Sequence, residues 1–334
     1  MKNVLVTGHK GYIGPHLINI LKKSNEYKIF GCDIGLFSDV AWRTLPNVDI
    51  EFNKDFRDLT ELELSQIDTV VHLAAISNDP MGDLDENITL NINAYGTEEF
   101  AEKCKKAGVK RFLMSSSCSI YGKSDKENMV ETDETEPLTT YAKSKIYVEE
   151  KVSKMSSDNF CVSFLRNSTA YGDSDNLRID LVVNNFLSCA IAKNEIQIMS
   201  DGTPWRPLIH CKDIANAFKL FIDAPSNLIN NQIVNIGSNN ENFQVKDVAD
   251  IAKKLFPDCD ITYTGEAVND SRDYKVNFNK FKNMFPDFNF EYNLLSGMEE
   301  LAKRLIDYSF SQDDFDGDQF IRLKTISKKL DLIL

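Results

Sequence analysis

The chain of 334 residues allows two domains or one large one, and its 42% hydrophobic and 27% charged content is typical of a folded globular protein. A net charge of −13 disfavours nucleic acid and anionic membranes as partners, because both bind basic surfaces. Seven cysteines without a CxxC pair predict reduced thiols in a cytoplasmic protein, and four scattered histidines predict no metal site. No signal peptide is expected, and no apolar run approaches the roughly 18 residues of a membrane span.

The first half of the chain alternates between short apolar runs and helical patterns. Strands are expected at 3–7, 27–33, 69–75, 111–117 and 161–167, with helical stretches at 12–24, 93–108 and 141–155. Strand, helix and strand at this spacing indicate right-handed βαβ units. The predicted fold class is therefore α/β, a doubly wound parallel sheet of the Rossmann type.

The pattern changes after about residue 170. Helices are expected at 180–193 and 245–256, separated by loops, and residues 310–320 are expected to form a loop before a short terminal helix. We interpret this half as a smaller C-terminal substrate-binding lobe. The predicted Rossmann domain covers 1–168, with a return of the chain at 209–237, and the lobe covers 169–208 and 238–334.

The segment VTGHKGYIG places Gly8, Gly11 and Gly14 between the first strand and the first helix. Glycines there allow a tight turn, the approach of a pyrophosphate and close packing of the helix on the sheet. Asp33 ends the second strand, where a carboxylate can bind the adenosine ribose and repel a 2′-phosphate, which favours NAD. The alternative is a tight turn without a ligand. His9 could contact a phosphate or face solvent.

The segment YAKSK places Tyr141 and Lys145 on one face of a predicted helix. A nearby ammonium stabilises a phenolate, so this pair can act as the base for a sugar or alcohol hydroxyl. The spacing alone is common on solvated helix surfaces, and it gains weight from the glycine-rich loop upstream.

The run SSSCSIYG (115–122) follows the fourth predicted strand. Ligands of doubly wound sheets bind beyond the carboxyl ends of the strands, so a serine hydroxyl here can polarise the substrate together with Tyr141. We expect this role for Ser117. For Ser115 and Ser116, capping of the next segment is an equal alternative.

Together these motifs resemble the extended short-chain dehydrogenase/reductase family, and within it the NAD-dependent nucleotide-sugar epimerases and dehydratases of the UDP-glucose 4-epimerase type. The resemblance also rests on HLAA (72–75), NAYGT (93–97), LRNSTAYG (165–172) and DGTPWRPLIHCKDIA (201–215). It extends to about residue 300 and is more specific for the family than for the substrate.

The resemblance implies roles for individual residues. It implies that Ser117, Tyr141 and Lys145 are catalytic. It implies that NAD is held by Gly8, Gly11, Tyr12, Ile13, Gly14, Asp33, Asp58, Leu73, Ala74, Ala75, Asn93, Ser115, Tyr141 and Lys145. It implies that a nucleotide-diphosphate sugar is held by Ser117, Thr169, Asn185, Arg206 and Arg272, with surface arginines in loops as the alternative for the last two.

The sequence departs from the family pattern at Cys118 and Ser119, where the dehydratases carry an Asp-Glu pair. Loss of water needs an acid and a base there, so 4,6-dehydration is disfavoured. A nucleophilic Cys118 is less expected than a buried packing residue. The predicted activity is therefore 4-epimerisation of a nucleotide sugar. A 4-ketoreductase or 4-dehydrogenase, and a regulatory NAD-binding protein, remain alternatives. A homodimer packed through 95–107 and 141–155 is expected by analogy.

Overall fold

A computed structural model describes residues 1–77, 85–124, 126–264 and 272–331. Its centre is a seven-stranded sheet in the order β10-β6-β5-β4-β1-β2-β3, and every pair in it is parallel. The predicted doubly wound fold is thus confirmed. The strands are β1 (Lys2–Thr7), β2 (Tyr27–Cys32), β3 (Ile50–Phe52), β4 (Thr69–His72), β5 (Arg111–Ser117), β6 (Cys161–Asn167) and β10 (Gln232–Ile236).

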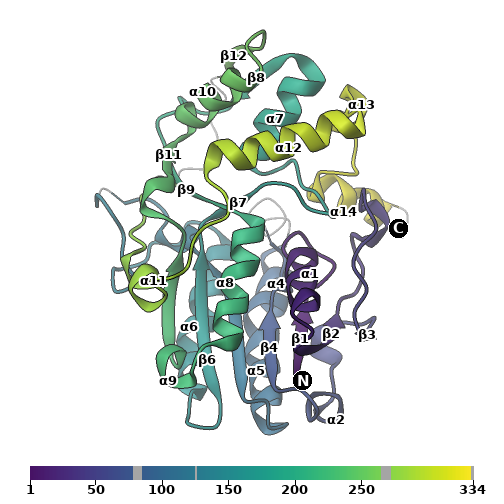
Figure 1. Ribbon diagram of the computed structural model, residues 1–334, viewed down its shortest axis with the longest axis vertical. Coiled ribbons are helices and arrows are strands. Elements are labelled where there is room, and N and C mark those ends of the chain that lie inside the picture. The colour runs from purple at the N-terminus through teal and green to yellow at the C-terminus, as the bar shows by residue number, and fades with distance from the viewer. Residues whose placement is uncertain (78–84, 125, 265–271, 332–334) are drawn as a thin grey trace.

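Helices cover both faces of this sheet (Figure 1). On one face α1 (Gly14–Ser24) packs against α8 (Cys211–Asp223), and on the other α5 (Gly96–Lys106) packs against α6 (Thr140–Val152). The strands read as continuous apolar runs because both of their faces are buried; Val4, Leu5 and Val6 are fully enclosed. Short elements complete this part: α2 (Glu61–Leu64), α4 (Glu86–Leu90), the π-helix η3 (Asn91–Tyr95) and α9 (Ser226–Ile229).

The topology changes direction between β1 and β4, which is where α/β sheets bind ligands. The strand expected at 69–75 ends at His72. The N–H of Leu73 still bonds the Thr7 carbonyl of β1, and further on the backbone N–H of Ile76 is bonded to the side chain of Asn93 at 2.8 Å. Strand β3 was not expected, since its three residues are too short to show a pattern.

The smaller lobe lies above the carboxyl end of the sheet (Figure 1). It holds a three-stranded sheet, β11-β9-β7, and a strand pair, β12-β8. Its elements are β7 (Thr169–Tyr171), α7 (Val182–Lys193), β8 (Glu195–Ile198), β9 (Trp205–His210), β11 (Asn242–Gln244), α10 (Val245–Leu255), β12 (Asp260–Tyr263) and α12 (Leu294–Tyr308). Helix α11 (Asn279–Met284) instead contacts β10 of the large sheet. The chain returns to the large sheet at α8, which packs on its face, and at β10, which joins its edge. The domain boundary predicted at 168 stays a prediction.

The C-terminal region differs from its expectation. Residues 310–320 were expected as a loop, but they contain α13 (Gln312–Asp316). Ser311 and Asp314 form a capping box that satisfies the first N–H groups of this helix. Helix α14 (Arg322–Asp331) follows and lies beside the segment after β2 (Figure 1).

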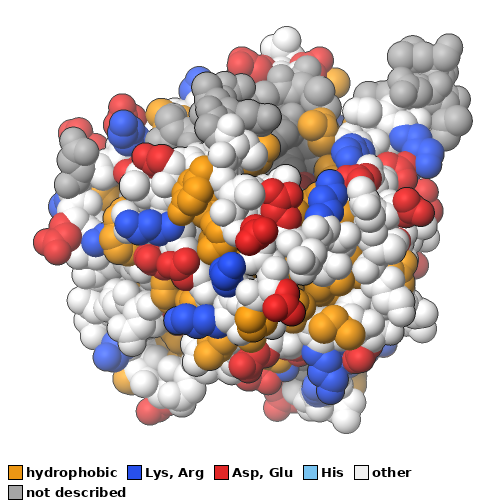
Figure 2. Space-filling model, turned by 90° about the horizontal axis from the view of Figure 1, so that it is seen from above, with side chains coloured by type: hydrophobic (Ala, Val, Ile, Leu, Met, Phe, Trp, Pro, Cys, Tyr) orange, Lys and Arg blue, Asp and Glu red, His pale blue; other side chains and the backbone are white. Residues whose placement is uncertain are grey.

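None of the described helices is long and apolar enough to cross a membrane. Viewed from the side of the smaller lobe, acidic and basic side chains alternate over the surface and do not separate by sign (Figure 2). The described residues of this face therefore form no extended basic patch.

Candidate active site

The glycine-rich loop has a geometry that only glycine can adopt at two positions. Gly8 has φ +72°, and a Cβ on it would lie 2.7 Å from the backbone nitrogen of Ala74. A Cβ on Gly14 would lie 2.3 Å from the carbonyl oxygen of His9. Helix α1 begins at Gly14 without a side-chain cap and without an acidic residue in its first turn, so its positive end suits an anion. These residues fit a dinucleotide diphosphate.

Asp33 directly follows β2 and faces this loop. Its carboxylate accepts hydrogen bonds from the N–H groups of Lys10 (3.1 Å) and Gly35 (2.8 Å). Two acceptor positions are thereby used, and the remaining lone pairs can accept ribose hydroxyls. The backbone bonds fix the carboxylate at the end of the strand, where sequence reasoning placed it.

The His9 side chain does not face solvent. It is 2% exposed, its ring packs over Gly31 of β2, and its Nε2 lies 3.3 Å from Glu51. Burial lowers its pKa, although Asp33 and Glu51 oppose this effect. The side chain is therefore a support beneath the loop.

Tyr12 and Ile13 precede α1, and the Tyr12 side chain is buried against the segment after β7. Its hydroxyl donates to the Gly172 carbonyl at 2.6 Å, and its own carbonyl accepts from Ser174 at 2.7 Å. Only the backbone of Tyr12 is thus free to face a cofactor, while the side chain joins the loop to the segment after β7.

Residues beyond β4 lie next to the glycine-rich loop. The N–H of Leu73 bonds to the Thr7 carbonyl, and the N–H of Ala74 reaches the Thr7 hydroxyl at 3.4 Å, so 73–75 continue alongside β1. Asn93 is 1% exposed and bonds both backbone groups of Ile76, at 2.8 and 2.9 Å. It therefore shapes this backbone. Asp58 is exposed in a 3-10 turn that follows β3.

The three serines of β5 have different partners. Ser115 Oγ accepts from the amide of Asn167 at 3.0 Å, and Ser116 Oγ donates to the buried Glu149 at 2.6 Å. Ser117 is the N-cap of the following 3-10 turn and accepts from the Ser119 N–H at 3.1 Å. Capping, which was an equal alternative for the first two serines, therefore falls on Ser117. Its hydroxyl proton is still available for donation to a ligand.

Tyr141 and Lys145 lie on the first two turns of α6, which contacts β5 and the turn after Ser117. The Lys145 ammonium is 5.3 Å from the centroid of the Tyr141 ring and donates to the Ser115 carbonyl at 2.8 Å. Burial lowers the pKa of Lys145 to about 8, and Glu149 opposes this. The ammonium is thus fixed beside the phenol.

A buried ion pair supports these residues, and sequence reasoning missed it. Glu149 and Arg166 are 4% and 5% exposed at their side chains and meet at 2.7 Å. Burial lowers the pKa of Arg166, but the bonds to Glu149 outweigh burial and raise it. Glu149 follows Lys145 by one helical turn, so its place on this face of α6 was visible in the sequence, but its pairing with Arg166 was not.

Cys118 and Ser119 are both buried, and neither carries a carboxyl at the position of the dehydratase Asp-Glu pair. The Cys118 thiol bonds the Arg166 carbonyl at 3.1 Å, and burial raises its pKa far above the usual range. This supports a packing role for the cysteine. No group of three or more His, Cys, Asp or Glu side chains in the described residues could hold a metal ion.

Apart from Ser117 at the end of β5, the predicted substrate residues lie in the smaller lobe and its junction. Arg206 of β9 is 7% exposed and donates through Nη1 to the backbone carbonyl of Arg272, so the structure brings this pair together. Thr169 begins β7 beside β9. The Asn185 amide is bonded to the Ile179 carbonyl at 3.1 Å, which uses one of its donors for the fold.

Arg178 was not predicted from sequence. It is 5% exposed, forms a forked pair with Asp180 (2.9 and 3.1 Å) and donates to the Ser77 hydroxyl at 3.2 Å. Burial lowers its pKa, but Asp180, Tyr12 and Tyr141 outweigh burial and raise it.

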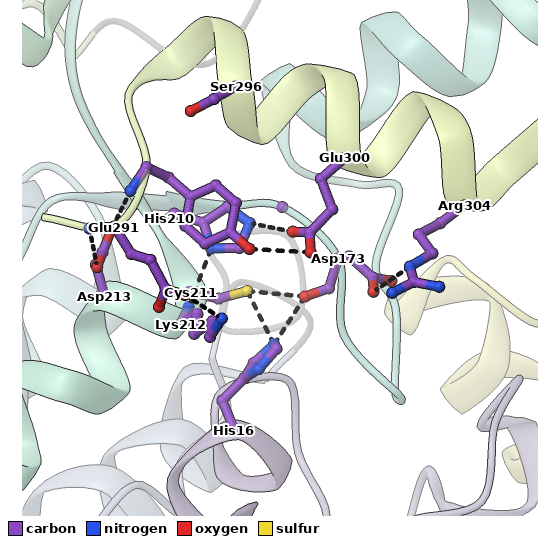
Figure 3. Close-up of polar contacts among 12 residues, drawn as sticks. His16, Asp173, His210, Cys211, Lys212, Asp213, Glu291, Ser296, Glu300 and Arg304 are labelled. Carbon is purple, nitrogen blue, oxygen red and sulfur yellow. Dashed lines mark hydrogen bonds and ion pairs between the residues drawn. The ribbon is translucent and has the colours of Figure 1, made fainter. Parts of the chain in front are cut away.

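A buried polar cluster joins the large sheet to the smaller lobe (Figure 3). The Cys211 thiol lies 3.1 Å from the Asp173 carbonyl and 3.3 Å from His16 Nε2. His210 Nε2 is 3.3 Å from Glu300. Burial raises the pKa of Glu300, but hydrogen bonds from His210 and a tyrosine outweigh it and lower the pKa to about 2. This cluster anchors α12 against α1 and α8.

Comparison with known proteins confirms the resemblance. The model of the NAD dependent epimerase/dehydratase family matches residues 4–237. A trifunctional Arabidopsis thaliana protein, UDP-glucose 4,6-dehydratase/UDP-4-keto-6-deoxy-D-glucose 3,5-epimerase/UDP-4-keto-L-rhamnose-reductase, is 29% identical over 85% of this chain and 44% of its own length. The UDP-glucose 4-epimerase of Neisseria meningitidis serogroup C is 28% identical over 71% of this chain and 78% of its own. The chain spans less than half the length of the trifunctional relatives.

Solved structures give the same result for the fold. MoeE5 in complex with UDP-glucose and NAD superposes with a TM-score of 0.79 at 26% identity, covering 92% of this chain and 99% of that one. TunA, an NAD dependent NDP-hexosamine 5,6-dehydratase of tunicamycin biosynthesis, has a TM-score of 0.82 at 22% identity and covers 94% and 100%, which shows a shared fold.

Proposed function

The chain belongs to the NAD-dependent epimerase/dehydratase family, and we propose that within it this protein is an NAD-dependent epimerase of nucleotide-activated sugars. The observation that carries the proposal is the buried Lys145 ammonium, held 5.3 Å from the Tyr141 ring beside the end of β5. A protein that only binds NAD has no need of a phenol that a neighbouring ammonium makes acidic enough to act as a base. Relatives described as UDP-glucose 4-epimerases, and the MoeE5 complex with UDP-glucose and NAD, support the substrate class.

The cofactor residues of the proposal are the glycine-rich loop, Asp33, the backbone at 73–75 and Lys145. Bound NAD supplies the acceptor and donor of hydride. Tyr141 removes the proton from the 4-hydroxyl of the sugar, and the Lys145 charge favours the phenolate. Ser117 donates a hydrogen bond to the same oxygen. After the 4-keto sugar turns, hydride would return to the opposite face of C4 while Tyr141 returns the proton to the oxygen, so that the configuration at C4 is inverted.

The substrate residues of the proposal are Ser117, Thr169, Asn185, Arg206 and Arg272. The two arginines would supply positive charge for the nucleotide diphosphate in an acidic protein. The same site could also perform a single redox step as a 4-ketoreductase or 4-dehydrogenase. Dehydration is disfavoured because Cys118 and Ser119 are buried and carry no carboxyl.

The test begins with the nucleotide content of the purified protein. Denaturation should release NAD, because an epimerase regenerates its cofactor in each cycle and need not exchange it. The protein should then invert one member of a panel of UDP-, GDP-, CDP- and dTDP-sugars, as detected by chromatography. Tyr141→Phe should abolish turnover and keep the bound NAD. Tyr147→Phe, on the same helix and bonded to Glu98, is the control that should remain active.

Other outcomes assign other functions. Empty protein that consumes NADH with a 4-keto sugar would indicate a reductase, and net NADH formation would indicate a dehydrogenase. If no sugar reacts and Tyr141→Phe changes nothing, the protein is an NAD-binding regulator and the catalytic proposal fails.

The proposal includes a cytoplasmic homodimer. The seven buried free cysteines are compatible with a reducing compartment. Helices α5 and α6 would form the interface, where Tyr95 is 45% exposed and its ring meets Tyr147 edge to face at 5.2 Å. Light scattering would show a mass near twice that of the chain, and a monomer would contradict the dimer.

A further inference from the structure

Helix α14 places a buried arginine next to the glycine-rich loop. Arg322, the first residue of this helix, is only 2% exposed. Its Nη2 donates to both the backbone carbonyl (3.1 Å) and the side-chain oxygen (2.6 Å) of Asn176. The amide of Asn176 donates in turn to the carbonyl of Lys10 at 2.7 Å. A chain of two hydrogen bonds therefore connects Arg322 with the loop that fits a diphosphate.

The charge of Arg322 is poorly compensated. Its Nη1 is buried and has no hydrogen-bond partner among the residues that the structure describes. The guanidinium lies over the ring of Phe37, with 4.2 Å between its central carbon and the ring centroid. Burial and the neighbouring Arg178 lower the pKa of Arg322 to about 9, whereas Asp180 and Asp33 raise it. A buried cation with an unused donor is costly unless an anion reaches it.

A second unused polar group lies close to Asp33. Ser38 Oγ is buried and has no hydrogen-bond partner in the described chain. A Cβ on Gly35 would be 3.2 Å from this oxygen, and the Gly35 N–H is bonded to Asp33. The end of β2 therefore combines the ribose-binding carboxylate with an unsatisfied hydroxyl.

The helix is fixed in this position by further bonds to the segment after β2. The Lys329 ammonium donates to the carboxylate of Asp39 at 2.6 Å and to the carbonyl of Leu36. The Gln319 amide donates to the carbonyl of Val40 at 3.2 Å. In Figure 1 α14 accordingly lies beside this segment, far in sequence from the glycine-rich loop. Bonds near both ends of α14 therefore fix the helix, and with it Arg322, against the segment after β2.

We propose that Arg322 binds the 5′-diphosphate of the dinucleotide through its free Nη1, an inference that rests on the proposed NAD dependence. The neighbouring Arg178 is already paired with Asp180, so an anion would relieve the repulsion between the two guanidinium groups. The diphosphate is the anion expected here, since the glycine-rich loop and α1 favour it and Asp33 repels a 2′-phosphate. Arg322 lies outside residues 4–237 that match the family, so the C-terminal helix would complete the cofactor site.

The test measures binding, not turnover. Calorimetry on nucleotide-free protein compares NAD, ADP, adenosine and 2′-AMP for the wild type, Arg322→Met and Arg322→Lys. Arg322→Met should weaken ADP and NAD roughly 10- to 100-fold, the value of a hydrogen bond to a charged group, and leave adenosine unchanged. Arg322→Lys should lose less. Lys324→Met, an exposed position on the same helix, should bind all four ligands like the wild type.

The outcomes separate this proposal from the proposed function. Equal weakening of adenosine and ADP by Arg322→Met would mean that Arg322 only supports the fold. If Arg322→Met weakens the binding of 2′-AMP but not that of ADP, Arg322 contacts a 2′-phosphate and not the diphosphate. Either result overturns the proposal, as does unchanged binding of ADP. If the wild type binds neither NAD nor ADP, the proposed NAD dependence itself fails. Should Arg322→Met not fold by circular dichroism, the ratio of ADP to adenosine affinity in Arg322→Lys decides.

Discussion

Replacing Glu149 with glutamine tests whether the buried ion pair supports the catalytic residues. Arg166 contacts Glu149 through three N–H···O distances of 3.1, 3.2 and 2.7 Å, and both side chains are at most 5% exposed. Removing one charge of a buried pair leaves the other uncompensated, which costs about 3–5 kcal/mol. Ser116 also bonds Glu149, at 2.6 Å, so the single amide oxygen of glutamine must replace two carboxylate oxygens.

The assay is urea unfolding followed by circular dichroism and tryptophan fluorescence. We expect the free energy of unfolding of Glu149→Gln to be lower than that of the wild type by about 3–5 kcal/mol. Glu150→Gln is the matched control, because Glu150 is exposed on the same helix, and it should change stability by less than about 0.5 kcal/mol. The double variant Glu149→Met with Arg166→Met should be more stable than Glu149→Gln, since no buried charge remains.

A shift of Glu149→Gln as small as that of the control would refute the reasoning. The same variant has a functional signature. The Glu149 carboxylate raises the pKa of Lys145 and so opposes the effect of burial. Removing this charge should therefore lower the pKa of Lys145 below its value of about 8 in the wild type. The alkaline limit of activity should move to lower pH.

Three further predictions concern the site. The pKa of Lys145 is lowered to about 8, so its ammonium is present below that pH and lost above it. We therefore expect kcat/KM to fall above about pH 8, and Lys145→Arg to move this alkaline limit to higher pH. If the limit is unchanged in Lys145→Arg, titration of the lysine is not its cause. Gly14→Ala places a Cβ 2.3 Å from the His9 carbonyl oxygen. The resulting strain of about 1–3 kcal/mol should weaken the binding of NAD measured by calorimetry. A wild-type affinity for NAD would show that the loop tolerates the added methyl group. Cys118→Ala should keep turnover, and native protein should resist iodoacetamide at Cys118, because its thiol is buried with a raised pKa; rapid labelling would contradict this.

Much of the fold could be predicted from the sequence because its signals are local. A continuous apolar run such as 3–7, followed by glycines and an amphipathic stretch, has few structures other than strand, tight turn and helix. Tyr141 and Lys145 share a helix face by spacing alone. Short strands carried too little pattern: β3, with three residues, was missed, and the strand at 69–75 was expected to be too long because the apolar run continues past His72 to Ala75.

The sequence by itself determined the parallel sheet, the glycine-rich loop with Asp33 and the helix that carries Tyr141 and Lys145, since each depends on residues near one another in the chain. Only the tertiary structure decided that Arg322 approaches that loop and that Arg166 meets Glu149. Those contacts join segments whose order in the chain places no restriction on their distance in space. The energetic effect of these charges depends on their burial, which cannot be read from the sequence.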